Sequence, residues 1–191
     1  MIMKKFLVFL AIISLGAALI WGIPWAMQKI AFNKATEANT VQAYYQFVTQ
    51  NKQAPQCAEA AERAAVFIDK GERLGEWPDF LAALGDTRSA RPLPVLVKYL
   101  RYPITEIRRA AAASLLKLAE DYPSEIVQTL GDPNQIAQMI EQDSDPRVRL
   151  DVRCLLWRVG SADLAEKIPE PSPFAQDGFA AYRSRHAAAA K

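Results

Sequence analysis

Two stretches of the chain repeat one pattern of residue types at an offset of 41 residues, and this repeat constrains the fold more than any other feature. The pattern begins at Ile107-Arg108 and again at Val148-Arg149, and the matching apolar pairs that follow are Ala111 and Val152, Leu115 and Leu156, and Leu118 and Val159. A period of about 40 to 47 residues is typical of solenoids built from pairs of helices. Such folds present surfaces to partners. The repeat therefore predicts an all-α fold, a short solenoid of helical hairpins.

The composition favours a helical fold and excludes few classes of function. The 191 residues include 23 basic and 21 acidic ones, a net charge of +2 that does not argue for a nucleic-acid partner. Alanine- and leucine-rich stretches favour helix, and no run alternates with the period of a strand. The length allows one domain and an anchor.

The beginning of the chain is strongly apolar. From Phe6 to Met27 there are 22 residues without a charge, enough for a helix that crosses a hydrocarbon core of about 30 Å. The alternative is a cleaved signal peptide, but the run is longer than such an apolar region and no small-x-small cleavage pattern follows it. We therefore expect an N-terminal single transmembrane helix, an uncleaved signal-anchor over residues 6–27.

The flanking charges suggest an orientation for this anchor. Lys4 and Lys5 precede it, whereas Lys29 and Lys34 follow it. The weak basic bias predicts a cytoplasmic N-terminus and a domain in the periplasm or an equivalent space.

A stripe of small residues lies along the same segment. Ser14, Ala18 and Gly22 are spaced four residues apart, so they would share one face of a helix. Such a stripe lets two membrane helices approach closely, although small residues are also common in these helices generally. The stripe is a candidate partner-binding surface.

The rest of the chain divides into three parts after the anchor at residues 1–30. Residues 31–91 hold a helical hairpin and linker, and its segment 38–70, with an aromatic-rich first helix and an alanine-rich second one, resembles a tetratricopeptide hairpin. Residues 92–168 hold the repeat units. Residues 169–191 form a proline-rich tail that we expect to be extended, either mobile or an arm whose aromatic residues insert into a partner.

The repeat units over residues 93–160 resemble HEAT repeats. The residues that carry the resemblance are the acidic turn Asp143-Ser144-Asp145-Pro146, the Val148-Arg149 pair behind it, and the apolar positions of the repeat. In that family such a turn begins the second helix of a unit, whose apolar face stacks on the next unit. Asp145 is then the N-cap and Pro146 the first helical residue. The earlier unit has Pro103-Ile104-Thr105-Glu106 instead, which predicts a weaker cap.

Residues for catalysis or metal binding are scarce. The only histidine is His186, in the tail, and no glycine-rich phosphate loop or Cys-x-x-Cys pair occurs. Asp143, Asp145 and Asp151 are close in sequence, but turn and cap positions account for them. Cys57 and Cys154 would lie in the first and last helical pairs, too far apart for a disulfide, so we expect two buried or half-buried free thiols. We predict neither an enzyme nor a cofactor.

Basic residues are the remaining candidates. Arg108 and Arg149 occupy equivalent positions, and Arg153 follows on the second helix. They either form an internal ladder with Asp145, Glu106 or neighbouring carbonyls, or present guanidinium groups to an acidic partner. We name all three as candidate partner-binding residues.

The prediction for function combines these features. We expect a membrane-anchored, non-enzymatic interaction protein, an accessory or assembly subunit of a membrane complex that binds other protein subunits and no nucleic acid. The alternative is a lyase or pigment- and ligand-binding protein, because some chromophore lyases also consist of HEAT-like repeats.

Overall fold

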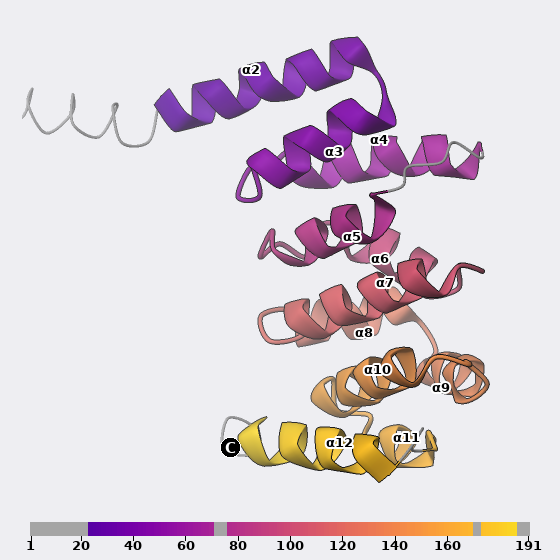
Figure 1. The fold of residues 1–191 in the computed structure, drawn as a ribbon. Helices are drawn as coiled ribbons and strands as arrows, with labels where there is room; N and C mark the ends of the chain where they lie inside the picture. Colours follow the sequence, from indigo (N-terminus) through magenta and orange to yellow (C-terminus); the bar gives the residue numbers. More distant parts are fainter. Residues whose placement is uncertain (1–22, 71–75, 170–172, 187–191) are drawn as a thin grey trace, which may run out of the picture.

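The computed structural model describes residues 23–70, 76–169 and 173–186, and within them the chain forms 11 helices and no strand (Figure 1). The all-α prediction is confirmed for these residues. The helices are α2 (Ile23–Ala38), α3 (Val41–Gln50), α4 (Cys57–Asp69), α5 (Trp77–Gly85), α6 (Leu93–Tyr99), α7 (Thr105–Leu118), α8 (Pro123–Leu130), α9 (Pro133–Glu141), α10 (Pro146–Arg158), α11 (Ala162–Lys167) and α12 (Pro173–His186).

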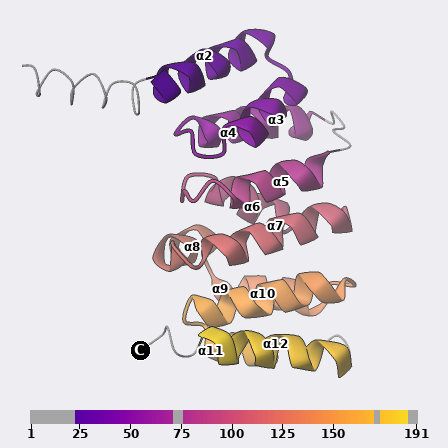
Figure 2. The same ribbon diagram turned by 60° about the vertical axis from the view of Figure 1, so that its left-hand side comes forward.

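The helices stack in order as two layers. One layer runs α2, α3, α5, α7, α10 and α12, and the other runs α4, α6, α8 with α9, and α11 (Figures 1 and 2). Each helix packs on its neighbour within the layer, while hairpin partners such as α3 and α4 pack across the layers. This arrangement is compatible with a helical-repeat solenoid, in which a unit touches only the next one.

Hydrogen bonds between units recur at similar sequence separations, from 31 to 36 residues. Ser114 Oγ donates to the Leu81 carbonyl 33 residues away, and Tyr122 Oη donates to the Arg88 carbonyl 34 residues away. Lys52 pairs with Asp86 at a separation of 34 residues. The 41-residue repeat of the sequence is a different quantity, the offset between equivalent positions of α7 and α10.

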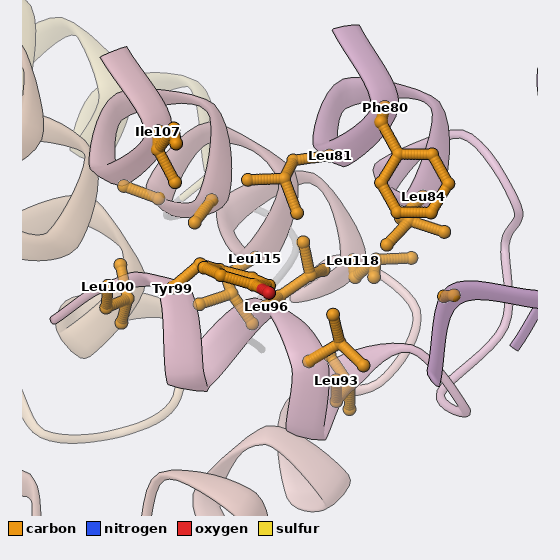
Figure 3. Close-up of a cluster of buried hydrophobic side chains, with 14 of the residues drawn as sticks. Phe80, Leu81, Leu84, Leu93, Leu96, Tyr99, Leu100, Ile107, Leu115 and Leu118 are labelled. Carbon is orange, nitrogen blue, oxygen red and sulfur yellow. The ribbon is translucent and has the colours of Figure 1, made fainter. Parts of the chain in front are cut away.

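The core is continuous along the stack. Leu81 of α5, Leu96 of α6 and Leu115 of α7 are fully buried against one another at its centre (Figure 3). The apolar positions of the repeat are buried as the helical spacing predicts, including Leu118 and Leu156, whereas Val159 at the end of α10 is only partly buried.

The two repeat helices begin differently, as their sequences predict. The Asp145 carboxylate caps α10 by accepting hydrogen bonds from the backbone N–H groups of Arg147 and Val148. The residue before α7 is Ile104, which has no side chain that can accept such a bond. The expected caps of both helices are therefore confirmed.

A close crossing of α5 and α7 yields a testable prediction. A Cβ atom added at Gly85 would lie 2.8 Å from Ser114 Cβ and 2.9 Å from its Cα. Because backbone would have to move, Gly85→Ala should lower the free energy of unfolding by about 1 to 3 kcal/mol, although alanine is the better helix former. Urea denaturation followed by circular dichroism measures this change.

Gly178→Ala is the control for that substitution. Its Cβ would meet the flexible end of Leu150, with Cδ2 at 3.0 Å, and no backbone atom, so the loss should be smaller. A Gly85→Ala protein as stable as the unmodified chain would contradict the close crossing.

The predicted N-terminal transmembrane helix needs correction. Among the residues that the structure describes, no helix is long and apolar enough to cross a membrane. The end of the predicted span, from Ile23 onward, belongs instead to α2, which continues through Lys29, Lys34 and Glu37 and packs Phe32 against Phe47 of α3. The described residues are therefore all-α, and they support neither this span nor the single-pass membrane localisation with a cytoplasmic N-terminus and a periplasmic domain. Residues 6–22, with the stripe of Ser14, Ala18 and Gly22, lie outside the described residues.

The tail also differs from the prediction. Instead of an extended segment over residues 169–191, the chain forms α12, and Pro173 stands at its first position, where proline is tolerated. Phe179 and Tyr182 are buried in the stack. The prolines therefore precede the helix, and packing of two aromatic residues holds it in place.

Candidate interaction surfaces

Arg108 is an internal link between two units. Its Nε and Nη2 atoms pair with the Asp143 carboxylate at 2.7 and 3.0 Å, and Nη1 donates to the carbonyls of Tyr102 and Pro103 at 2.9 Å each. The two side chains are 14% and 5% exposed. Burial disfavours the charge of Asp143, but the bonds from Arg108 and from the Asp145 N–H outweigh it and hold the pKa of Asp143 below its usual value.

Arg149 repeats part of this arrangement one unit later. Arg108 donates to the carbonyl six residues before it, at Tyr102, and Arg149 donates to the carbonyl six residues before it, at Asp143. Arg109 adds an ion pair with Asp145. The internal ladder is therefore present with neighbouring carbonyls as predicted, but the acidic partner of Arg108 is Asp143 instead of the predicted Asp145 or Glu106.

Arg153 is buried beneath the last helix. Its Nε donates to the Ala165 carbonyl at 2.8 Å, and its guanidinium lies 4.1 Å from the centre of the Phe179 ring. Only 7% of the residue is exposed. All three predicted arginines thus have a scaffold role, while their role in binding a partner stays a prediction.

Asp151 carries the most unfavourable charge of the repeat helices. It lies partly buried on α10, and burial, followed by repulsion from Asp145, raises its pKa to about 6. Arg109 and Arg147 oppose this shift without cancelling it. Near neutral pH the folded chain therefore holds a carboxylate where its charge is disfavoured.

Asp151→Asn should stabilise the protein at pH 7.5. The unfolded carboxyl has a pKa of about 3.9 and the folded one about 6, so the penalty is full above pH 6 and disappears as the pH falls towards 4. After allowance for partial exposure, the gain in the free energy of unfolding should be about 1 to 2 kcal/mol at pH 7.5 and close to zero at pH 4.

Urea denaturation at a series of pH values measures the effect. Asp163→Asn, at an exposed position of α11, is the control and should change the free energy of unfolding by less than about 0.5 kcal/mol. An Asp151→Asn protein that is less stable at pH 7.5 would show that the carboxylate is favourably paired.

The two thiols are buried and free, as the sequence predicts. Burial raises the pKa of Cys57 to about 11 and that of Cys154 to about 12. Both therefore stay protonated at neutral pH, which makes them poor nucleophiles. Within the described ranges no group of three or more His, Cys, Asp or Glu residues is placed to hold a metal ion.

A groove of about 510 Å³ lies between the loop joining α6 to α7 and the loop joining α9 to α10. Its apolar lining includes Leu100, Tyr102 and Met139, and the exposed Arg101 stands at its rim. Sequence reasoning missed this groove because its two loops lie about one repeat apart, and because the acidic turn in the second loop indicates only the start of a helix.

The first half of α2 is an exposed apolar surface. Trp25, Met27 and Ile30 are 53%, 65% and 56% exposed. This half of the helix projects beyond the end of α3 in both views (Figures 1 and 2). Sequence reasoning assigned these residues to a membrane span or its edge, although the Phe32 and Ala35 spacing that follows is that of a helix packed on one side.

The comparisons with known proteins add no relative. The chain matches no family model, and no curated protein or solved structure is significantly similar to it.

Proposed function

We propose that the protein is a non-enzymatic scaffold whose helix pairs resemble HEAT repeats and which binds another protein through the apolar half of α2. The observation that carries this proposal is the exposure of Trp25, Met27 and Ile30 on one half of one helix. This surface, here called the α2 patch, consists of these three residues.

The α2 patch is unusual within the stack. Six large apolar side chains are exposed among the described residues, and the other three, Val66, Ile104 and Val127, are scattered over α4, the start of α7 and α8. Scattered apolar residues are ordinary, whereas clustered ones mark interaction surfaces. In α2, Met27 and Ile30 share one side of the helix and Trp25 lies on the other, so the first half of α2 is apolar on two sides, which favours a protein partner at this end.

The two ends of the stack also differ. Solenoids need terminal helices with a polar outer face. At the far end, the exposed side chains among residues 178–186 of α12 are small or polar, namely Ala180, Ala181, Arg183, Ser184 and Arg185. At the near end α2 exposes large apolar side chains instead, which favours a binding role for the outer surface of this helix.

The charges near the α2 patch suggest what its partner offers. Lys29 lies 5.3 Å from the centre of the Trp25 ring, Lys34 is exposed one turn further on, and Glu37 is the only acidic residue of α2. An apolar partner surface with an acidic rim would complement this arrangement.

Affinity purification of the tagged full chain from the cells that make it tests the proposal. Trp25→Glu with Ile30→Glu should reduce the recovery of stoichiometric partners at least about tenfold, because charges would be buried in the interface. Ile104→Glu with Val127→Glu, which places the same charges at exposed apolar positions elsewhere, should leave recovery unchanged. Equal recovery with all three proteins, at equal thermal stability, would refute the proposal.

A further inference from the structure

The last helix, α12, rests on few contacts. It packs mainly on α10, and among its described side chains, Gly178 to His186, only Phe179 and Tyr182 are buried. It is also the end of the stack, with a neighbour on one side only (Figure 1). In a solenoid the terminal element with few buried contacts opens first.

The site that receives Phe179 belongs to α10 and α11 rather than to α12. The ring lies 4.1 Å from the Arg153 guanidinium and 5.6 Å from that of Arg183. Arg153 Nε donates to the Ala165 carbonyl of α11. The Glu166 carboxylate, also on α11, lies 3.5 Å from Arg153 Nη2. Both bonds join α10 to α11, so they remain when α12 leaves.

Glu166 gives the site a preference for a basic residue. It pairs with Arg183 of α12 at 2.5 Å on the outer side and with Arg153 on the inner side. A ligand helix is therefore favoured by an aromatic residue over Arg153 and by an arginine one turn further on, beside Glu166.

Tyr182 fits less well than Phe179. Its ring meets Trp157 edge-on at 5.9 Å and stacks on His186 at 4.2 Å. Its hydroxyl is buried, however, and has no hydrogen-bond partner in the described part of the chain. A buried hydroxyl without a partner disfavours the docked state, so α12 is an imperfect occupant of its own site.

We infer that α12 is a detachable cap over a helix-binding surface formed by Arg153, Trp157 and Glu166, and that a partner helix replaces it. The partner is an amphipathic helix with two aromatic residues three positions apart and an arginine directly after the second, the pattern of Phe179, Tyr182 and Arg183. Such binding uses the helix-in-groove mode, with anchors on one helical face. This surface lies at the opposite end of the stack from the α2 patch and does not depend on it.

A fluorescent peptide with the sequence of residues 173–186 tests the inference on the full chain. In the unmodified chain the tethered α12 competes at an effective concentration of the order of millimolar. Phe179→Ser with Tyr182→Ser weakens that competitor and leaves the surface intact, so this variant should bind the peptide at least about tenfold more tightly. Adding Arg153→Met should remove the gain, and a peptide carrying the two serines should not bind.

Hydrogen exchange on the unmodified chain is the second measurement. Amides of α12 should exchange faster than those of α7 and α10, and the peptide should protect α10 and α11 in the serine variant. Equal exchange of α12 and α10, loss of α10 protection in the serine variant, or no peptide binding to that variant would each overturn the inference. Dimers of the unmodified chain that require Phe179 would overturn the choice of partner, because a second copy would then be the occupant.

Discussion

Leu115→Ala is expected to lower the free energy of unfolding by about 3 to 5 kcal/mol. Leu115 is fully buried at the centre of the core, where α7 meets α5 and α6 (Figure 3). Alanine would leave a cavity among Leu81, Leu96 and Leu118, and the helices around it are held on both sides by further units. Urea denaturation followed by circular dichroism gives the loss directly.

Leu116→Ala is the matched control, because it removes the same atoms from the adjacent position of α7. Leu116 is only partly buried, so its substitution should cost about 1 kcal/mol. Equal losses for the two variants would mean that the side of α7 carrying Leu115 does not face α5 and α6.

Arg108→Ala is the second substitution with a large expected effect, a loss of about 3 to 5 kcal/mol in the free energy of unfolding. It leaves the buried Asp143 carboxylate without its counter-charge and frees two loop carbonyls. Arg108→Ala combined with Asp143→Ala should recover part of the loss, because no uncompensated charge then remains buried.

Arg91→Ala is the control for this pair. Arg91 also bonds across a unit boundary, to the Pro55 carbonyl at 3.1 Å, but from an exposed position, and its loss should cost less than about 1 kcal/mol. The pH dependence gives a further check. The pKa of Asp143 is lowered in the folded chain, so its contribution is present above about pH 4 and is lost as the pH falls further. In Arg108→Ala this acid-dependent loss should be smaller.

The parts of the fold that sequence predicts well are those with strong local signals. The helix α10 follows from its Asp145-Pro146 start and from apolar residues at helical spacing, and both features are present as predicted. The register of Arg108 and Arg149 is likewise a local property of two repeats. The pairing of Arg108 with Asp143 is not a local property, because it depends on how one unit is positioned against the next.

The errors arise where packing between distant segments decides the outcome. The apolar composition at the start of the chain predicts a membrane span through Met27, whereas the residues from Ile23 onward belong to α2, a helix that continues through charged residues and packs Phe32 on Phe47 of α3. The prolines before residue 173 favour extended chain, but Phe179 and Tyr182 find buried sites on α10, and α12 forms.

The central claim, an ordered stack in which each unit contacts the next, is tested most directly by zero-length carbodiimide cross-linking of the full chain followed by mass spectrometry. Asp86 pairs with both Lys52 and Lys117, 34 and 31 residues away, so each lysine should form its own link to Asp86 within a single chain, and Asp86→Asn should abolish both. Absence of both links, together with links between units at opposite ends such as Lys34 to Glu166, would contradict the stacked order.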